Sequence, residues 1–137
     1  MKLINLFLFL FLLGCVSCKS PEENIPNESI QIIPLPNSYE LKPGSFCMTG
    51  QTTIGIDTSD PAMVALAEYF NEKTSDATGF SLPVGDSGTI VFQLGDYKEL
   101  GEEGYQLSVS SGKLVLSAYK HHGISVISRQ LMYHVFC

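Results

Sequence analysis

Two segments in the last third of the chain alternate apolar and polar residues, and this alternation limits the fold more than any other feature. The apolar positions are Tyr105, Leu107 and Val109 on one arm and Leu114, Leu116 and Ala118 on the other. The residues between the arms, 110–113, include a glycine and are typical of a tight turn, so the pattern predicts a β-hairpin. Because successive strand residues point to opposite faces, the hairpin has one buried and one polar face. It therefore needs an apolar layer on one side only.

Two segments have the period of amphipathic helices and would supply that layer. Asp60-Pro61 predicts a helix start, because aspartate caps helices and proline fits the first helical position. Gly79 predicts the end of this helix. Its apolar face is formed by Met63, Leu66, Ala67 and Phe70. A second helix is expected over residues 121–136, with one apolar stripe of Ile124, Ile127, Leu131 and Val135.

Short β-prone runs fill the rest of the chain, at residues 30–33, 46–48, 52–56, 80–84 and 89–94. A turn over 85–88 separates the last two. The order of elements is β-α-β-β-β-α, and the strands are apolar on one side. This order predicts an α+β fold in which a mainly antiparallel sheet carries two helices packed on one face.

The first residues are typical of an export signal. Lys2 precedes an apolar run, Leu3 to Leu13, that is too short to span a membrane, which takes about 20 apolar residues. The run ends at Leu12-Leu13-Gly14-Cys15, which resembles the lipobox of bacterial lipoproteins, with Cys15 as the lipidated residue and Cys18 as the fallback. An ordinary cleaved signal peptide and an uncleaved anchor are the alternatives. Residues 1–14 are thus expected to be the signal peptide, 15–29 a flexible tether and 30–137 one folded domain.

A lipidated cysteine would hold the exported protein on a membrane surface without spanning it. We expect the outer membrane, on its periplasmic or cell-surface side. Glu22-Glu23, soon after the cysteine, resembles the surface-export tags of lipoproteins in the Bacteroidetes.

The composition argues against several classes of partner. The net charge of −6 argues against nucleic-acid binding, which needs basic patches. Cys47 and Cys137 could pair, but nothing local requires it, so we expect two unpaired thiols. No Cys/His spacing resembles a zinc site, and the sequence predicts no metal ion and no cofactor.

A few residues could in principle carry chemistry. Paired carboxylates can share acid and base roles. Asp96 and Glu102-Glu103 could form such a pair, but we expect them to lie in a solvated charged loop. His121-His122 could bind metal or move protons, but exposed residues at a helix start are the expected reading. The serines (Ser45, Ser108, Ser110) lack a His/Asp constellation, and 101–104 is too short and acidic to cradle phosphate. Tyr133 and Phe136 are expected to be core or interface aromatics.

Several motifs in order resemble one known family. They are Ile32-Ile33-Pro34-Leu35-Pro36, Phe46 with Thr52-x-Ile54, Leu66-Ala67-Glu68-Tyr69-Phe70, Ala77-Thr78-Gly79-Phe80, Glu103-Gly104-Tyr105-x-Leu107-x-Val109 and Gly123-Ile124. Together they resemble the N-terminal, non-catalytic domain of bacterial β-N-acetylhexosaminidases of glycoside hydrolase family 20, in a Bacteroidetes-like form. These enzymes remove terminal β-linked N-acetylhexosamine from glycans.

The resemblance implies that a catalytic (β/α)₈ barrel follows this domain in full-length relatives. The family's catalytic pair is an adjacent Asp-Glu, and the substrate's own 2-acetamido group is the nucleophile. This sequence has no Asp-Glu dipeptide and no tryptophan for a sugar pocket, so no catalytic residue carries over. The closing helix also reads Ser128-Arg129-Gln130-Leu131 where relatives usually have a Gln-Thr-Leu-like stretch.

Because the chain ends at Cys137 inside the expected second helix, we expect a truncated and inactive fragment that meets a glycan substrate only if a barrel is present. Two alternatives remain open. The chain could be a stand-alone surface lipoprotein that binds glycan or a protein partner, or a scaffold that docks onto a separately encoded barrel.

Overall fold

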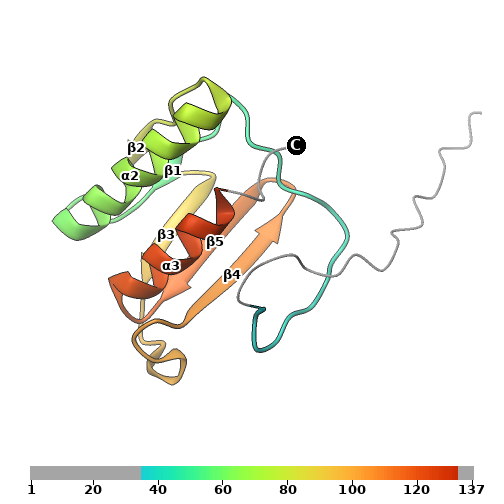
Figure 1. The fold of residues 1–137 in the computed structure, drawn as a ribbon, viewed down its shortest axis with the longest axis vertical. Coiled ribbons are helices and arrows are strands. Elements are labelled where there is room, and N and C mark those ends of the chain that lie inside the picture. The colour runs from blue at the N-terminus through green and yellow to red at the C-terminus, as the bar shows by residue number, and fades with distance from the viewer. Residues whose placement is uncertain (1–34, 133–137) are drawn as a thin grey trace, which may run out of the picture.

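Both long helices of the domain lie side by side on one face of a five-stranded sheet (Figure 1). The computed structural model describes residues 35–132. The strands are β1 (Ile54–Gly55), β2 (Val84–Gly85), β3 (Ile90–Leu94), β4 (Tyr105–Ser110) and β5 (Lys113–Ala118). The helices are α2 (Pro61–Thr78), α3 (His121–Leu131) and a short 3₁₀ helix, η1 (Lys98–Leu100). The α+β class with helices on one face is therefore confirmed.

Helix α2 begins and ends where its sequence predicts. The Asp60 carboxylate Oδ1 accepts hydrogen bonds from the backbone N–H groups of Ala62, at 2.9 Å, and Met63, at 3.3 Å. At the other end Gly79 adopts a left-handed conformation, φ 79°, and its N–H donates to the Ser75 carbonyl. Both ends thus satisfy backbone groups that a helix otherwise leaves without partners.

The predicted hairpin is confirmed, although Val109, which was expected on its buried face, is exposed. Strands β4 and β5 pair antiparallel, from Tyr105 opposite Ala118 to Ser110 opposite Lys113. Residues Leu114, Leu116 and Ala118 are buried under the helices. The alternate residues on β4, from Gln106 to Ser110, are exposed.

The prediction of a mainly antiparallel sheet is wrong. The strand order is β2-β1-β3-β5-β4, and β1 runs parallel to both β2 and β3, as β3 does to β5. Among the described strands, β4 and β5 form the one antiparallel pair. Alternation of apolar residues reports which face is buried and carries no information on strand direction, which the connections determine.

The decisive connection is the segment 86–89. If β2 and β3 were neighbouring antiparallel strands, this segment would be a hairpin turn. It instead crosses β1, so that β2 and β3 pair with opposite edges of β1. Gly88 lies so close to Gly55 that a Cβ on Gly88 would sit 2.4 Å from the Gly55 nitrogen. The crossing is held by hydrogen bonds between Thr53 and Thr89, whose backbone N–H groups each donate to the other's hydroxyl. Two glycines therefore permit a sharp crossover that keeps β2 and β3 parallel.

Several expected strands are shorter than predicted or fall elsewhere. The runs at 52–56 and 80–84 each contribute a two-residue strand, β1 and β2, and 46–48 forms no strand. The run at 30–33 lies outside the described residues. Helix α3 ends at Leu131 with Met132 as its C-cap, and residues 133–136 of its expected continuation lie outside the described residues.

The core fills the space between the helices and the sheet. Phe70 of α2 meets Phe92 of β3 edge to face, with ring centroids 5.4 Å apart, and both are almost fully buried. Ile124 and Ile127 of α3 reach the same cluster, which confirms the predicted apolar stripe at these positions. Edge-to-face aromatic pairs add about 0.5–1.5 kcal/mol beyond the area that they bury.

Cys47 differs from expectation. It is disulfide-bonded, so the prediction of an unpaired thiol at this position is wrong. The other cysteines (Cys15, Cys18 and Cys137) lie outside the described residues. Within residues 35–132 no helix is both long and apolar enough to cross a membrane.

Candidate functional site

The acidic loop does not assemble a pair of carboxylates. Asp96, Glu102 and Glu103 are all exposed on the segment around η1, at the edge of the domain. Asp96 Oδ1 forms an exposed ion pair with Lys98 Nζ at 2.9 Å. Such surface pairs contribute little, about 0–1 kcal/mol, and the loop is the solvated segment that the sequence predicts.

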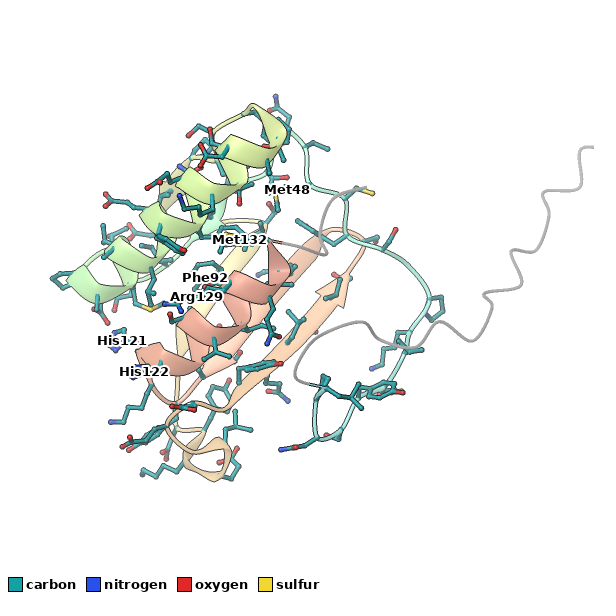
Figure 2. All side chains as sticks on the ribbon, in the orientation of Figure 1. Met48, Phe92, His121, His122, Arg129 and Met132 are labelled. Atoms are coloured by element: carbon teal, nitrogen blue, oxygen red, sulfur yellow. The ribbon has the colours of Figure 1, made fainter. Side chains whose placement is uncertain are left out.

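One histidine of the predicted pair has a partner from a distant part of the chain. Figure 2 shows His121 and His122 at the N-terminal end of α3. His121 Nε2 lies 2.7 Å from Asp60 Oδ2, whereas His122 is exposed. The side chains of His121 and Asp60 keep 41% and 28% of their exposure, so the contact is half-buried. Sequence reasoning identified Asp60 as a cap and missed this pairing, because 61 positions separate the residues and no local pattern connects them.

The environment of Asp60 favours its charged form. The hydrogen bond from His121 is the main cause, and those from the N–H groups of Met63 and Ala62 add to it, so the pKa of Asp60 lies below the ordinary 3.8. Partial burial opposes this lowering. The carboxylate therefore stays ionised well into the acidic range.

A histidine beside a carboxylate is also part of catalytic triads, but here the arrangement stops at two residues. A triad needs a nucleophile within hydrogen-bond reach of the imidazole. The candidate serines Ser45 and Ser108 are exposed elsewhere, and the Ser110 hydroxyl donates to the Lys113 carbonyl within the hairpin turn. Within the described residues, no three His, Cys, Asp or Glu side chains are placed to hold a metal ion. The geometry gives the Asp60–His121 pair a structural role.

The remaining candidates have structural explanations or lie outside the described residues. Gly101 has φ 74° and ends η1, and Gly104 packs on the Leu100 carbonyl, so 101–104 forms a tight turn and no phosphate loop. The predicted lipidation residues Cys15 and Cys18, and the aromatics Tyr133 and Phe136, lie outside the described residues.

Two of the sequence motifs meet in space. A Cβ on Gly123 would lie 2.3 Å from the Gly104 carbonyl oxygen and 2.8 Å from the Ala118 Cβ. Glu103-Gly104-Tyr105 and Gly123-Ile124 are therefore two sides of one contact, at which the first turn of α3 rests on the backbone that leads into β4. The two motifs therefore mark a close packing contact between α3 and the sheet.

The sequence profile of glycosyl hydrolase family 20, domain 2, matches residues 29–126 of this chain. The chain belongs to this family. A search of curated protein sequences finds no match.

Solved structures of family-20 enzymes contain a domain with the same fold. The β-N-acetylhexosaminidase from Streptomyces coelicolor A3(2) is 29% identical over 73% of this chain, with a TM-score of 0.66, and the match covers 20% of that enzyme. The N-acetyl-β-hexosaminidase of Streptomyces plicatus is 30% identical over 65% of this chain and 19% of its own, with a TM-score of 0.55. The β-N-acetylhexosaminidase from Bacteroides fragilis shares the fold at 18% identity over 74% of this chain and 20% of its own, with a TM-score of 0.59. This chain thus spans about a fifth of the length of these enzymes.

Proposed function

We propose that this chain acts as the accessory domain 2 of a β-N-acetylhexosaminidase, a glycoside hydrolase that removes terminal β-linked N-acetylhexosamine from glycans. The observation that carries the proposal is the family match over residues 29–126, together with the same fold in family-20 enzymes at 25–30% identity. An accessory role follows from the chain's own chemistry. The sequence has no Asp-Glu dipeptide, and the described carboxylates are exposed or occupied in capping.

In this proposal the groups that cleave the glycosidic bond come from a catalytic barrel domain. Glycoside hydrolysis needs carboxyl groups fixed on either side of the scissile bond, or the substrate's own acetamido group in place of one of them. Domain 2 supplies none of these. Its contribution is a rigid α+β body on which a barrel can rest, and glycan binding belongs to the barrel.

A domain exchange tests the proposal. Residues 30–137 of this chain would replace domain 2 of the Streptomyces coelicolor hexosaminidase, to which they are 29% identical. We expect the hybrid to be soluble and to hydrolyse p-nitrophenyl N-acetyl-β-glucosaminide, whereas the same enzyme without domain 2 loses soluble activity. A hybrid carrying Gly123→Leu is the matched control, since a larger side chain at this position would collide with the Gly104 backbone and disrupt the α3 contact. A hybrid no better than the deletion variant would refute the accessory role.

Assays of the purified chain alone provide a second test of the same proposal. We expect purified protein to show no hydrolysis of the chromogenic glycoside above the blank. Turnover that grows in proportion to protein concentration, and that survives a second purification step, would mean that residues of this chain catalyse the reaction. A glycan array with the same sample distinguishes the alternative, a stand-alone glycan-binding lipoprotein, by a reproducible ligand.

The location of the protein is part of the proposal. We propose that it is exported and lipid-anchored at the outer membrane through Cys15, because the apolar run and Leu12-Leu13-Gly14-Cys15 fit a lipobox. Labelling with an alkyne fatty acid in the host should mark the wild-type chain and the Cys18→Ser variant. Label that persists in Cys15→Ser but disappears in Cys18→Ser would move the anchor to Cys18.

A further inference from the structure

One carboxylate serves the N-terminal ends of both long helices. Asp60 Oδ1 caps α2 through the N–H groups of Ala62 and Met63, and Oδ2 contacts His121, the first residue of α3. The residue before α3, Lys120, makes no side-chain capping hydrogen bond. The two helices run side by side in the same direction, so their N-terminal ends lie together (Figure 1). Asp60 is therefore the polar side chain on which both ends converge.

Two helix N-termini that lie together repel each other electrostatically, and the Asp60 carboxylate offsets this repulsion. A helix N-terminus carries a partial positive charge, and a cation in the first turn is unfavourable there. A carboxylate between the two ends offsets the partial positive charge of both helices at once.

The charged or titratable residues next to Asp60 and His121 in the sequence have other contacts or are exposed. Within residues 35–132, His121 is the titratable side chain that acts on the Asp60 carboxylate. Of its neighbours, Lys120 has its ammonium 4.5 Å over the Tyr119 ring, and His122 points to solvent as an exposed residue. On the α2 side Asp57 accepts a hydrogen bond from the Ser59 N–H.

We propose that Asp60 and His121 form a latch that fixes the start of α3 against the start of α2, and that protonation of Asp60 opens it. The latch goes beyond the accessory role, because it concerns the relative placement of the two helices in the lone domain. When Asp60 is protonated its remaining carbonyl oxygen still caps α2, so acid releases α3 first.

The sign of the pH dependence follows from Asp60. Its pKa is below 3.8 in the folded protein, chiefly because of the His121 hydrogen bond. A lowered carboxyl pKa contributes stability that is complete above the unfolded value of about 3.9 and is lost as the pH falls through the folded value. The latch is therefore closed at pH 5 and opens below the ordinary pKa of an aspartate.

Amide hydrogen exchange of the full chain, followed by NMR, tests the latch. The amides of Ser125 and Val126 bond to the carbonyls of the first two residues of α3 and report on its first turn. In Asp60→Asn the cap is retained, since asparagine caps as well as aspartate, but the charge is gone. We expect exchange at Ser125 and Val126 to be about two- to fivefold faster than in the wild type at pH 5, with α2 amides unchanged.

Variants at the two histidines supply the controls. His121→Ala should reproduce the faster exchange, and Asp60→Asn with His121→Ala should add nothing further, because both remove one interaction. His122→Ala, the same change one residue along, should exchange as the wild type does. The acid-induced loss of protection should disappear in Asp60→Asn. Unchanged protection in both single variants, losses that add in the double variant, or equal losses in α2 and α3 would each overturn the latch.

Discussion

Replacing Gly123 with alanine should weaken the contact between α3 and the backbone that leads into β4. The added Cβ would lie 2.3 Å from the Gly104 carbonyl oxygen and 2.8 Å from the Ala118 Cβ, where ordinary contacts start at 3.4 Å. The methyl group therefore needs about 1 Å of additional space on its closest side. Gly104 cannot provide it cheaply, because this residue is itself packed against the Leu100 carbonyl.

Two opposing terms set the size of the effect. Alanine is favoured over glycine inside a helix by up to about 1 kcal/mol, which would stabilise α3. Overpacking of a close contact costs about 1–3 kcal/mol, and the upper half of that range applies here because the nearest atom belongs to backbone. The net expectation is a loss of about 1–2 kcal/mol in the free energy of unfolding. For a domain of this size that loss lowers Tm by roughly 5–15 °C.

Urea unfolding and thermal melts of the two proteins measure this difference directly. Gly112→Ala is the matched control, because that glycine sits in the hairpin turn with open space around its Cβ position and an ordinary φ. It should change stability by no more than about 0.5 kcal/mol. If Gly123→Ala proves more stable than the wild type, helix propensity decides at this site and the close packing of α3 on Gly104 is refuted.

Three further substitutions probe separate parts of the core. Gly88→Ala should cost at least about 1–3 kcal/mol in urea unfolding, because its Cβ would meet the Gly55 backbone at 2.4 Å; Gly85→Ala, with open space, should cost far less, and equal losses would refute the crossover. Thr74→Val should leave stability unchanged or raise it by about 1 kcal/mol, because the Thr74 hydroxyl is buried without a hydrogen-bond partner; a loss beyond 1 kcal/mol would reveal one. Phe92→Ala should cost about 3–5 kcal/mol in the same assay, and a loss under 1 kcal/mol would contradict its central place in the core.

Local chemistry made part of this fold predictable from sequence. Helix α2 was placed to the residue because its start and end each depend on one side chain or glycine acting within four positions, Asp60 and Gly79. The hairpin was equally predictable from the sequence, since its register follows from a short turn and a two-residue period. Signals of this range survive in a single sequence because the groups that make them are neighbours along the chain.

Strand direction was not predictable in the same way. A glycine-rich stretch such as 85–88 is compatible with a hairpin and with a crossover, and the sequence predicted only a turn there within a mainly antiparallel sheet. What selects the crossover is the approach of Gly88 to Gly55, two residues on separate segments that only the fold brings together. The reciprocal bonds between Thr53 and Thr89 depend on the same approach. A long-range contact without a local pattern thus determined the feature that sequence reasoning got wrong.

The Asp60–His121 pair has the same origin. Each residue had a local interpretation, one as a helix cap and the other as an exposed helix start, and both interpretations were consistent with the sequence. Their contact appears only because α2 and α3 begin at the same end of the sheet. Sequence reasoning could have raised the possibility from the unusual placement of a histidine in a first helical turn, where a nearby anion is expected.

The motifs that mark this family in the described domain have a role in packing, which is a physical reason distinct from catalysis. The motifs that mark the family in this domain include glycines at sites of close backbone packing, Gly104 against Leu100 and Gly123 against Gly104. A side chain at either position would collide with backbone atoms, so both positions restrict substitution for reasons of packing. Motifs of this kind identify a fold, and they give no evidence for chemistry within the domain that contains them. The hybrid with a barrel is therefore the sample in which activity should be sought, and its Gly123→Leu variant tests whether that activity depends on the packing of α3 on Gly104.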